Sequence, residues 1–470
     1  MSMENSEIMK QPEIEQGEIS EQKEITQKTE QPPSDWEKER TARIDQILSV
    51  TKEIDALIFN AGEKGIENIM EVFENIDRFE TLAYGKEIGR DIVGEPGMNA
   101  ITRRTYEGKE GGPGAIAYVK PESGETTFEY DEVADTLFDV RYHPDKKSGK
   151  MQKIRRPSKR EDAQNIVALF KSRAEVGQLT AERYGITPEE LVLHTPEEMT
   201  LRYGVEARST ALREYAASRV NELLNWDIVP LTVLRPEEDG QDMASVQEAV
   251  PAADPKIPPK TTDADNLEDI LDLGAEHPGA KSFMRIACFD YLIKSTDRWN
   301  ENIIYDEVAE KYYAIDNGLS LGLSLVYKGE NQPADPYTSI PMEIVQEHSD
   351  WKLDTEAITE LQRFHDETTE YLAQLEKGGA DETKKDVGIK HLTSIFRLLY
   401  DHEKIAKEEA LDFFKRINYL LQNGRPPTLQ KVKSHVPGQL VDRLNIEEAA
   451  TSAPRQPKAY AQTEMADSAQ

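Results

Sequence analysis

The sequence predicts an α+β fold of two lobes, in which a small antiparallel sheet precedes a mainly helical half. Between about 88 and 130, short apolar runs alternate with Gly and Pro clusters, a pattern typical of an antiparallel meander of about three strands. Residues 281–294 are apolar on most sides of a helix, and residues 354–423 carry three amphipathic helical patterns. A sheet followed by helices is the element order of an α+β protein.

Between these regions the apolar spacing predicts further elements in chain order. A helix is expected at 208–224, with its apolar residues on one side. Strands are expected at 228–234 and 243–250. Two short apolar runs at 303–305 and 312–315 predict a hairpin, because only a few polar residues separate them.

Changes in composition divide the chain into parts. Residues before Trp36 are rich in Glu and Gln and contain no aromatic side chain, so they bury too little apolar surface to offset the entropy of ordering. The expected parts are a disordered acidic tail (1–35), an N-terminal helical segment (36–87), an N-terminal lobe (88–250) with a basic insertion at about 126–205, a linker or insertion (251–275), a helical C-terminal lobe (276–436) and a mostly disordered tail (437–470).

The charge of the chain limits its partners. Lys and Arg number 57 and Asp and Glu number 89, which gives a formal net charge of −32 in 470 residues. General nucleic-acid binding needs a basic face that neutralises phosphates, so nucleic acid is not an expected partner. The hydrophobic fraction of 37% fits a globular core with sizeable solvated segments.

Targeting and redox signals point to the cytoplasm. No run of about 18 apolar residues is present, so no transmembrane helix is expected. The first residues lack the apolar core of a signal peptide. Cys288 is the only cysteine, which excludes an intrachain disulfide and a cysteine-based zinc site. Its apolar neighbours predict a buried side chain.

The strongest chemical signal lies in residues 290–318, DYLIKSTDRWNENIIYDEVAEKYYAIDNG. Asp297 and Asn302 precede the predicted hairpin, and Asp316 follows it. Because a hairpin returns the chain to its start, these three side chains are expected to lie close together. Oxygen ligands at such a point suit Mg²⁺, which is usually bound by a few protein oxygens together with phosphate oxygens.

The same spacing is that of phosphoryl transfer in protein kinases. These enzymes use a catalytic-loop Asp, an Asn five residues later and a metal-binding Asp before Gly. The chain differs from the usual H-R-D and D-F-G motifs, since Ser295 and Thr296 precede Asp297, and Asn317 replaces the Phe. A standard Ser/Thr or Tyr kinase is therefore not expected.

The sequences of the motifs resemble those of the phosphatidylinositol 3-/4-kinase superfamily, particularly the type II phosphatidylinositol 4-kinases and their bacterial relatives. Four ordered motifs over roughly 115–325 make the resemblance specific. The matching segments are Val119–Pro121 with Gly124-Glu125, Arg213–Ala217 with Ile228–Pro230, Ala244–Gln247, and Phe289–Ile293 with Thr296–Arg298, Asn300–Asn302 and Ala314–Leu319. The resemblance implies a two-lobed, protein-kinase-like fold that binds ATP and Mg²⁺.

The resemblance also implies the roles of single residues. Lys120 would contact the ATP phosphates and pair with Glu214, and Asp297 would be the catalytic residue. Asn302 and Asp316 would hold the metal. The adenine would be bound at a hinge formed by Gln247, Glu248 and Val250.

Two glycine-rich segments could cover the phosphates. The first contains Gly94 and Gly97, and the second is Gly111–Gly114. The first is favoured because it leaves one strand on each side before Lys120. Glu95 within it is unfavourable beside phosphates.

The stretch Lys146–Arg160 is strongly basic. It could be an exposed flexible loop, or it could contact an anionic membrane, an acidic substrate or the acidic tail of the chain.

The expected activity is transfer of the γ-phosphoryl group of ATP, with Mg²⁺, to a hydroxyl of a protein, a lipid or a small molecule. Residues 320–335 contain only Lys328 as a basic residue, which favours a protein or small-molecule acceptor over a phosphoinositide. The alternatives are a pseudokinase scaffold that binds nucleotide, and transfer of AMP from ATP on the same fold.

Overall fold

The structure, a computed structural model, describes most of the chain between residues 69 and 428 and part of a helix before it. The described residues are 42, 44–52, 54–55, 69–92, 101–108, 111, 113–144, 151–159, 163–191, 205–206, 208–237, 243–250, 274–323, 339–347, 351–376, 387–400 and 402–428. The expected tails, nearly all of the expected linker at 251–275, and the glycines Gly94 and Gly97 lie outside them.

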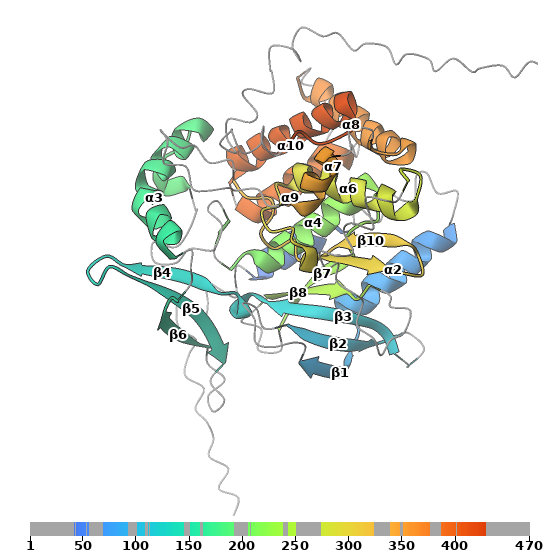
Figure 1. Cartoon of the computed structure of the whole chain (residues 1–470). Coiled ribbons are helices and arrows are strands. Elements are labelled where there is room, and N and C mark those ends of the chain that lie inside the picture. The colour runs from blue at the N-terminus through green and yellow to red at the C-terminus, as the bar shows by residue number, and fades with distance from the viewer. Residues whose placement is uncertain are drawn as a thin grey trace, which may run out of the picture.

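A five-stranded antiparallel sheet forms the N-terminal half (Figure 1). Its strands are β1 (Glu87–Ile92), β2 (Thr102–Glu107), β3 (Pro113–Pro121), β7 (Thr232–Pro236) and β8 (Met243–Glu248). Their order across the sheet is β1-β2-β3-β8-β7. The first three strands form the predicted meander. β7 begins at Thr232, later than predicted, because Pro230 has no N–H to donate to a neighbouring strand and the Ile228 carbonyl accepts the Ala314 N–H.

The register of the sheet decides which side chains face the helical half. Ala117 and Val119 of β3 and Val246 of β8 pack under helix α2 (Ile69–Tyr84), through Phe79 and others. Successive strand residues point to opposite faces, so Lys120 lies on the face away from α2. The sheet therefore presents Lys120 to the rest of the protein.

The described part of the basic insertion forms a second antiparallel sheet, whose strands the sequence did not predict, and a helix. β4 (Thr127–Asp131), β5 (Thr136–Pro144) and β6 (Met151–Pro157) pair in that order, and they are followed by α3 (Ala163–Tyr184) and a short turn of helix, η3 (Pro188–Glu190). Phe128 and Leu137 of the sheet pack against Ile166 and Phe170 of α3. The flexible-loop interpretation of the basic stretch is therefore wrong for residues 151–157, which form a strand.

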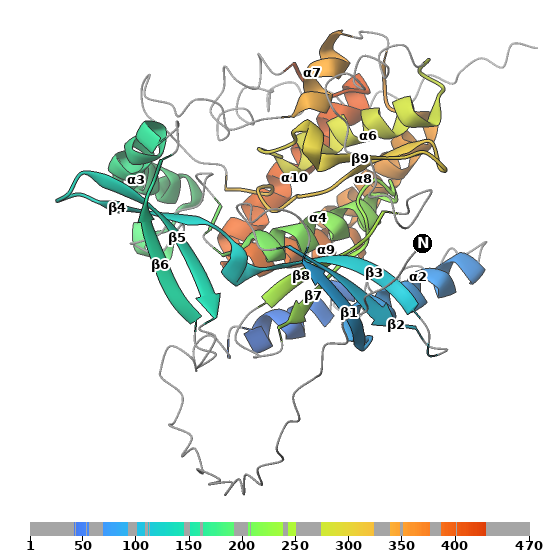
Figure 2. The same ribbon diagram turned by 60° about the horizontal axis from the view of Figure 1, so that its bottom comes forward.

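The C-terminal half is mainly helical, as predicted (Figure 2). Its elements, with the helix α4 that precedes β7, are α4 (Thr210–Leu224), α6 (Pro278–Ile293), η4 (Asn300–Asn302), β9 (Ile303–Asp306), β10 (Lys311–Ala314), α7 (Ile340–Glu347), α8 (Thr355–Glu376), α9 (Val387–Tyr400) and α10 (Glu403–Asn423). β9 and β10 pair as the predicted hairpin. The α+β class is confirmed.

One large hydrophobic core joins α4 and α6 to helices α8, α9 and α10. Residues on every side of α6 are buried, including Cys288, as predicted. Almost every residue of α4 is buried as well, so the expectation of a one-sided apolar face is wrong for this helix.

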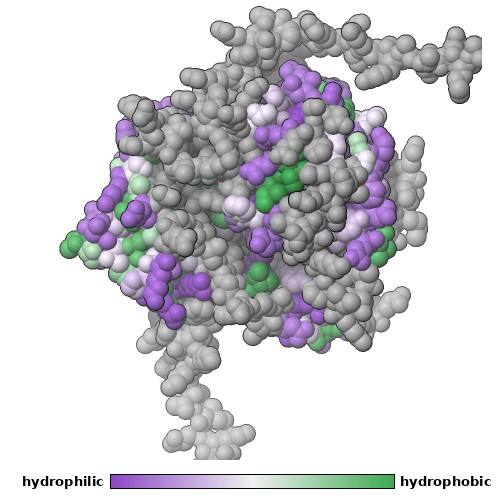
Figure 3. Space-filling model, viewed as in Figure 1, coloured by the Kyte–Doolittle hydropathy of each residue, from purple (hydrophilic) through white to green (hydrophobic). Residues whose placement is uncertain are grey.

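In the described part of the chain, no helix is long and apolar enough to cross a membrane. Figure 3 shows that polar residues predominate among the coloured residues of one face.

Candidate functional site

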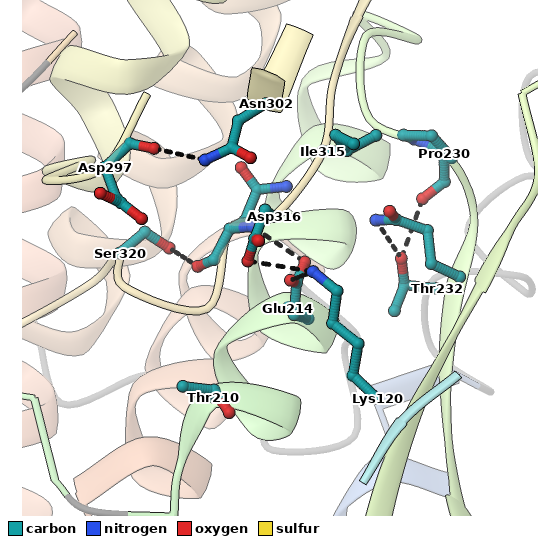
Figure 4. A network of polar contacts seen from close by, with 12 residues as sticks. Lys120, Thr210, Glu214, Pro230, Thr232, Asp297, Asn302, Ile315, Asp316 and Ser320 are labelled. Atoms are coloured by element: carbon teal, nitrogen blue, oxygen red, sulfur yellow. Dashed lines mark hydrogen bonds and ion pairs between the residues drawn. The ribbon is translucent and has the colours of Figure 1, made fainter. Parts of the chain in front are cut away.

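Lys120 lies at the centre of a group of charges from three separate parts of the chain (Figure 4). Its ammonium nitrogen is 2.9 Å from Glu214 Oε1 of α4 and 3.0 Å from Asp316 Oδ1, which follows β10. Burial would lower the pKa of Lys120, but the two carboxylates outweigh it and raise the pKa above its ordinary value. The lysine is therefore a cation at neutral pH.

The two carboxylates differ in their surroundings. The Glu214 side chain is 2% exposed, and its second oxygen accepts the Asn317 N–H at 2.9 Å. Burial raises the pKa of Glu214, although Lys120 opposes the shift. Burial also acts to raise the pKa of Asp316, but there the lysine prevails and the pKa is lowered. Asp316 is thus held as an anion, which is the form that binds a metal.

The hairpin β9–β10 brings Asn302 beside Asp316, as the spacing predicts. The Ile315 N–H donates to the Asn302 carbonyl at 3.0 Å. The Asn302 side-chain nitrogen in turn donates to the Asp297 carbonyl at 2.7 Å. In Figure 4 the side chains of Asp297, Asn302 and Asp316 lie together across from Lys120.

Asp316 has a left-handed backbone conformation, with φ of +54°. Among residues other than Gly, Asn and Asp adopt this region most readily, so an aspartate suits the position. The turn lets the carboxylate point back toward Lys120 directly after β10 ends at Ala314. The conformation is therefore part of how the site is assembled.

Arg298 joins the two loops of the site, an arrangement that the sequence motifs do not reveal. Its side chain is 0% exposed, and Nε is 3.1 Å from Asp290 Oδ1 of α6. Its guanidinium also donates to the carbonyls of Asn302 and Ile315 and to the Asn317 side chain. One buried cation thus fixes the loop of Asp297 against the loop of Asp316. The adjacency of an Arg to the candidate catalytic Asp was the available signal.

Helix α4 holds the segment after Asp316 at several points. The Arg213 guanidinium donates to the carbonyls of Ser320 and Leu321, at 3.0 and 2.6 Å. A Cβ added to Gly318 would lie 2.9 Å from the Thr210 Cβ, so only glycine allows this approach. The helix that carries Glu214 is therefore packed directly on the loop that carries Asp316.

A buried carboxyl lies beside the start of α4. Glu125 Oε2 accepts the hydroxyl of Thr210 at 3.0 Å. Burial is the main cause that raises the pKa of Glu125 to about 7, while Thr210 and two arginines oppose it only in part. Glu125 therefore changes charge near neutral pH.

The three predicted hinge residues lie at the end of β8 and just after it. The Gln247 side chain shares the face of Lys120 and donates to Thr232 Oγ1 at 3.2 Å. The Glu248 side chain lies on the opposite face and forms an ion pair with Arg78 of α2. Val250 is buried. The side chains of Gln247 and Glu248 are thus engaged within the protein, and any adenine contact here would use the backbone.

The basic stretch is partly neutralised within its own sheet. Lys153 forms an ion pair with Glu129 of β4, and Arg155 lies 3.1 Å from the same carboxylate. Arg156 and Lys159 are exposed. The described part of the stretch is therefore less cationic than its sequence indicates.

The site combines the Lys120 cation with three groups that could bind metal or accept a proton, Asp297, Asn302 and Asp316, and Arg298 supports their loops. Among the described residues, no group of three or more His, Cys, Asp or Glu side chains could hold a metal ion alone. Asp316 and Asn302 fit Mg²⁺ when phosphate oxygens complete the shell.

The sequence matches no protein-family model, and it matches no curated protein.

Proposed function

We propose that the chain is an atypical kinase, which transfers the γ-phosphoryl group of ATP, with Mg²⁺, to a hydroxyl. The observation that carries this proposal is the ion-paired group of Lys120, Glu214 and Asp316, with Asp297 and Asn302 beside it. Phosphoryl transfer needs positioning and charge neutralisation more than covalent chemistry, and these side chains can supply both.

The arrangement of the elements supports the same proposal. A five-stranded antiparallel sheet carries the lysine, the next helix in contact with it carries the glutamate, and a hairpin after a buried helix carries the remaining groups. This is the order expected of a two-lobed, protein-kinase-like fold of the phosphatidylinositol 3-/4-kinase type. A chance cluster of charges would not be expected to combine these contacts with this order of elements along the chain.

Each residue has a role in the proposed reaction. Lys120 would bind the phosphates, Glu214 would orient Lys120, and Asn302 and Asp316 would hold Mg²⁺, which when bound neutralises phosphate charge. Asp297 would take the proton of the acceptor hydroxyl. The hydroxyl oxygen then bonds to the γ-phosphorus, and the bond from that phosphorus to the bridging oxygen breaks, so that ADP leaves with the electron pair.

The acceptor can be a protein, a lipid or a small molecule. The pairing of Lys153 and Arg155 with Glu129 reduces the charge that the basic stretch could offer an anionic surface. Lys153 and Arg155 are exposed but paired with Glu129, so such contact would use Arg156 and Lys159, which are exposed as well.

The test compares ATP labelled at the γ- and α-phosphate. Label from the γ-position alone, transferred to the protein itself or to water, supports a kinase, and label from the α-position supports AMP transfer. Asp297→Asn should lower the rate by about a hundredfold or more, because a general base contributes that much. Glu301→Gln is the matched control, since Glu301 lies exposed in the same loop. Wild-type protein that transfers neither label supports a scaffold.

Metal binding is tested apart from activity. Saturating Mg·ATP at a hundred times its Kd should stabilise the wild type by about 2.7 kcal/mol. Asp316→Ala should lose most of the Mg²⁺-dependent part of this gain. Equal stabilisation of both proteins would contradict the metal assignment.

A further inference from the structure

Trp299 is a half-exposed aromatic residue directly beside the proposed catalytic carboxylate. It is 47% exposed, whereas its neighbour Arg298 is fully buried. Its indole nitrogen donates to Asp297 Oδ1 at 2.9 Å. The proposed reaction assigns no role to this hydrogen bond.

The position of the indole is set by the loop around it. The Trp299 carbonyl accepts the Asn302 N–H at 3.0 Å, which starts the short helix η4. The Asn302 side chain donates to the Asp297 carbonyl at 2.7 Å, and the indole N–H closes the circuit on the Asp297 side chain. Three hydrogen bonds therefore tie the backbone and side chain of Asp297 to the residue that would hold the metal.

Such a contact has a specific effect on a carboxylate. A donor bound to one oxygen fixes the rotation of the carboxyl group, so that the group keeps one orientation toward an approaching hydroxyl. An indole nitrogen can only donate, so it cannot take the proton in place of Asp297. Holding the reacting groups in the right geometry supplies a large part of the rate enhancement of an enzyme.

We propose that Trp299 is a positioning residue, which orients the Asp297 carboxylate toward the acceptor hydroxyl through its indole N–H. This inference rests on the proposed function. It assigns to Trp299 a role in the rate of transfer and none in the binding of Mg·ATP.

Two substitutions separate the hydrogen bond from the ring. Trp299→Phe keeps an aromatic ring and removes the donor, and Trp299→His keeps a ring N–H. The assay is the release of phosphate from ATP at saturating Mg²⁺, with water as the acceptor. The Phe variant should lower kcat by about tenfold at an unchanged KM for ATP, since a hydrogen bond to a charged group is worth about that factor. The His variant should recover most of the loss.

The contact itself can be measured without activity. In a ¹⁵N-labelled protein, the indole N–H signal of Trp299 is the one that disappears in Trp299→Phe. It should shift in Asp297→Ala and stay in place in Glu301→Gln. An unmoved signal in Asp297→Ala would show that the hydrogen bond is not formed.

The outcomes distinguish this inference from the proposed function. Active wild type with an equally active Phe variant overturns the role of Trp299 and leaves the kinase proposal standing. Phe and His variants that are equally slow show a structural role of the ring and also overturn the inference. Wild type that transfers no phosphoryl group overturns both.

Discussion

Arg298→Met should be among the most destabilising single substitutions in the site. Methionine preserves much of the side-chain volume but leaves the Asp290 carboxylate with a hydroxyl donor, Ser339, and no cation, and both side chains of the ion pair are 0% exposed. Removing one partner of a buried ion pair costs about 3–5 kcal/mol. Burial already raises the pKa of Asp290 despite Arg298. The loss should therefore be smaller at acid pH, where Asp290 can take up a proton.

The assay is denaturant unfolding of Arg298→Met, Asp290→Asn and the double variant. Asp290→Asn removes the buried charge, so the double variant should be more stable than the sum of the two single losses predicts. Arg90→Met is the control, because Arg90 pairs with Glu87 at an exposed position, where about 1 kcal/mol or less is expected. Additive losses, or an Arg298→Met protein within about 1 kcal/mol of wild type, would refute the reasoning.

Three further substitutions test the support of the site. Gly318→Ala should lower the free energy of unfolding by about 1–3 kcal/mol, because its methyl group would lie 2.9 Å from the Thr210 Cβ; unchanged denaturant unfolding would contradict that contact. Glu125 has a pKa raised to about 7 from 4.5, so its contribution is fully present below pH 4.5 and is lost as the pH rises through 7. Between pH 4.5 and 8, the free energy of unfolding of the wild type should therefore fall by about 3 kcal/mol relative to that of Glu125→Gln. Parallel pH profiles of the two free energies would contradict the raised pKa. Asp55→Asn should cost about 3 kcal/mol, since Asp55 lies 2.8 Å from the fully buried Arg219, and a loss below about 1 kcal/mol in the same unfolding assay would mean the pair is dispensable.

The fold was predictable where the apolar period was strong. The three C-terminal helices and the buried helix α6 have long periodic patterns, and each formed as expected. The sheet β4–β5–β6 was missed because α3 covers it on one face, and its other face carries charged side chains such as Glu129 and Arg155. These charges pair across strands, and pairing of this kind depends on a register that the local sequence does not reveal.

Within the site, the motif spacing and the family resemblance predicted which side chains would lie together. Lys120 meets Glu214 and Asp316 although they are far apart in the chain, and the hairpin places Asn302 beside them. The roles of Arg298 and Trp299 could not be obtained in this way. Their contacts depend on how one loop turns, and an arginine in a polar segment most often lies on the surface, whereas Arg298 is buried.

Helix α4 explains why the expected side chains meet so closely. Its charged residues Arg213, Glu214 and Arg219 are all buried, and they bond to three different parts of the chain. Apolar burial is itself non-directional and depends on the area buried, so it does not select one set of side-chain partners. Three buried charges do select one, since each shift of the helix would leave a charge without its partner. The buried charges of α4 are therefore what fix Glu214 against Lys120.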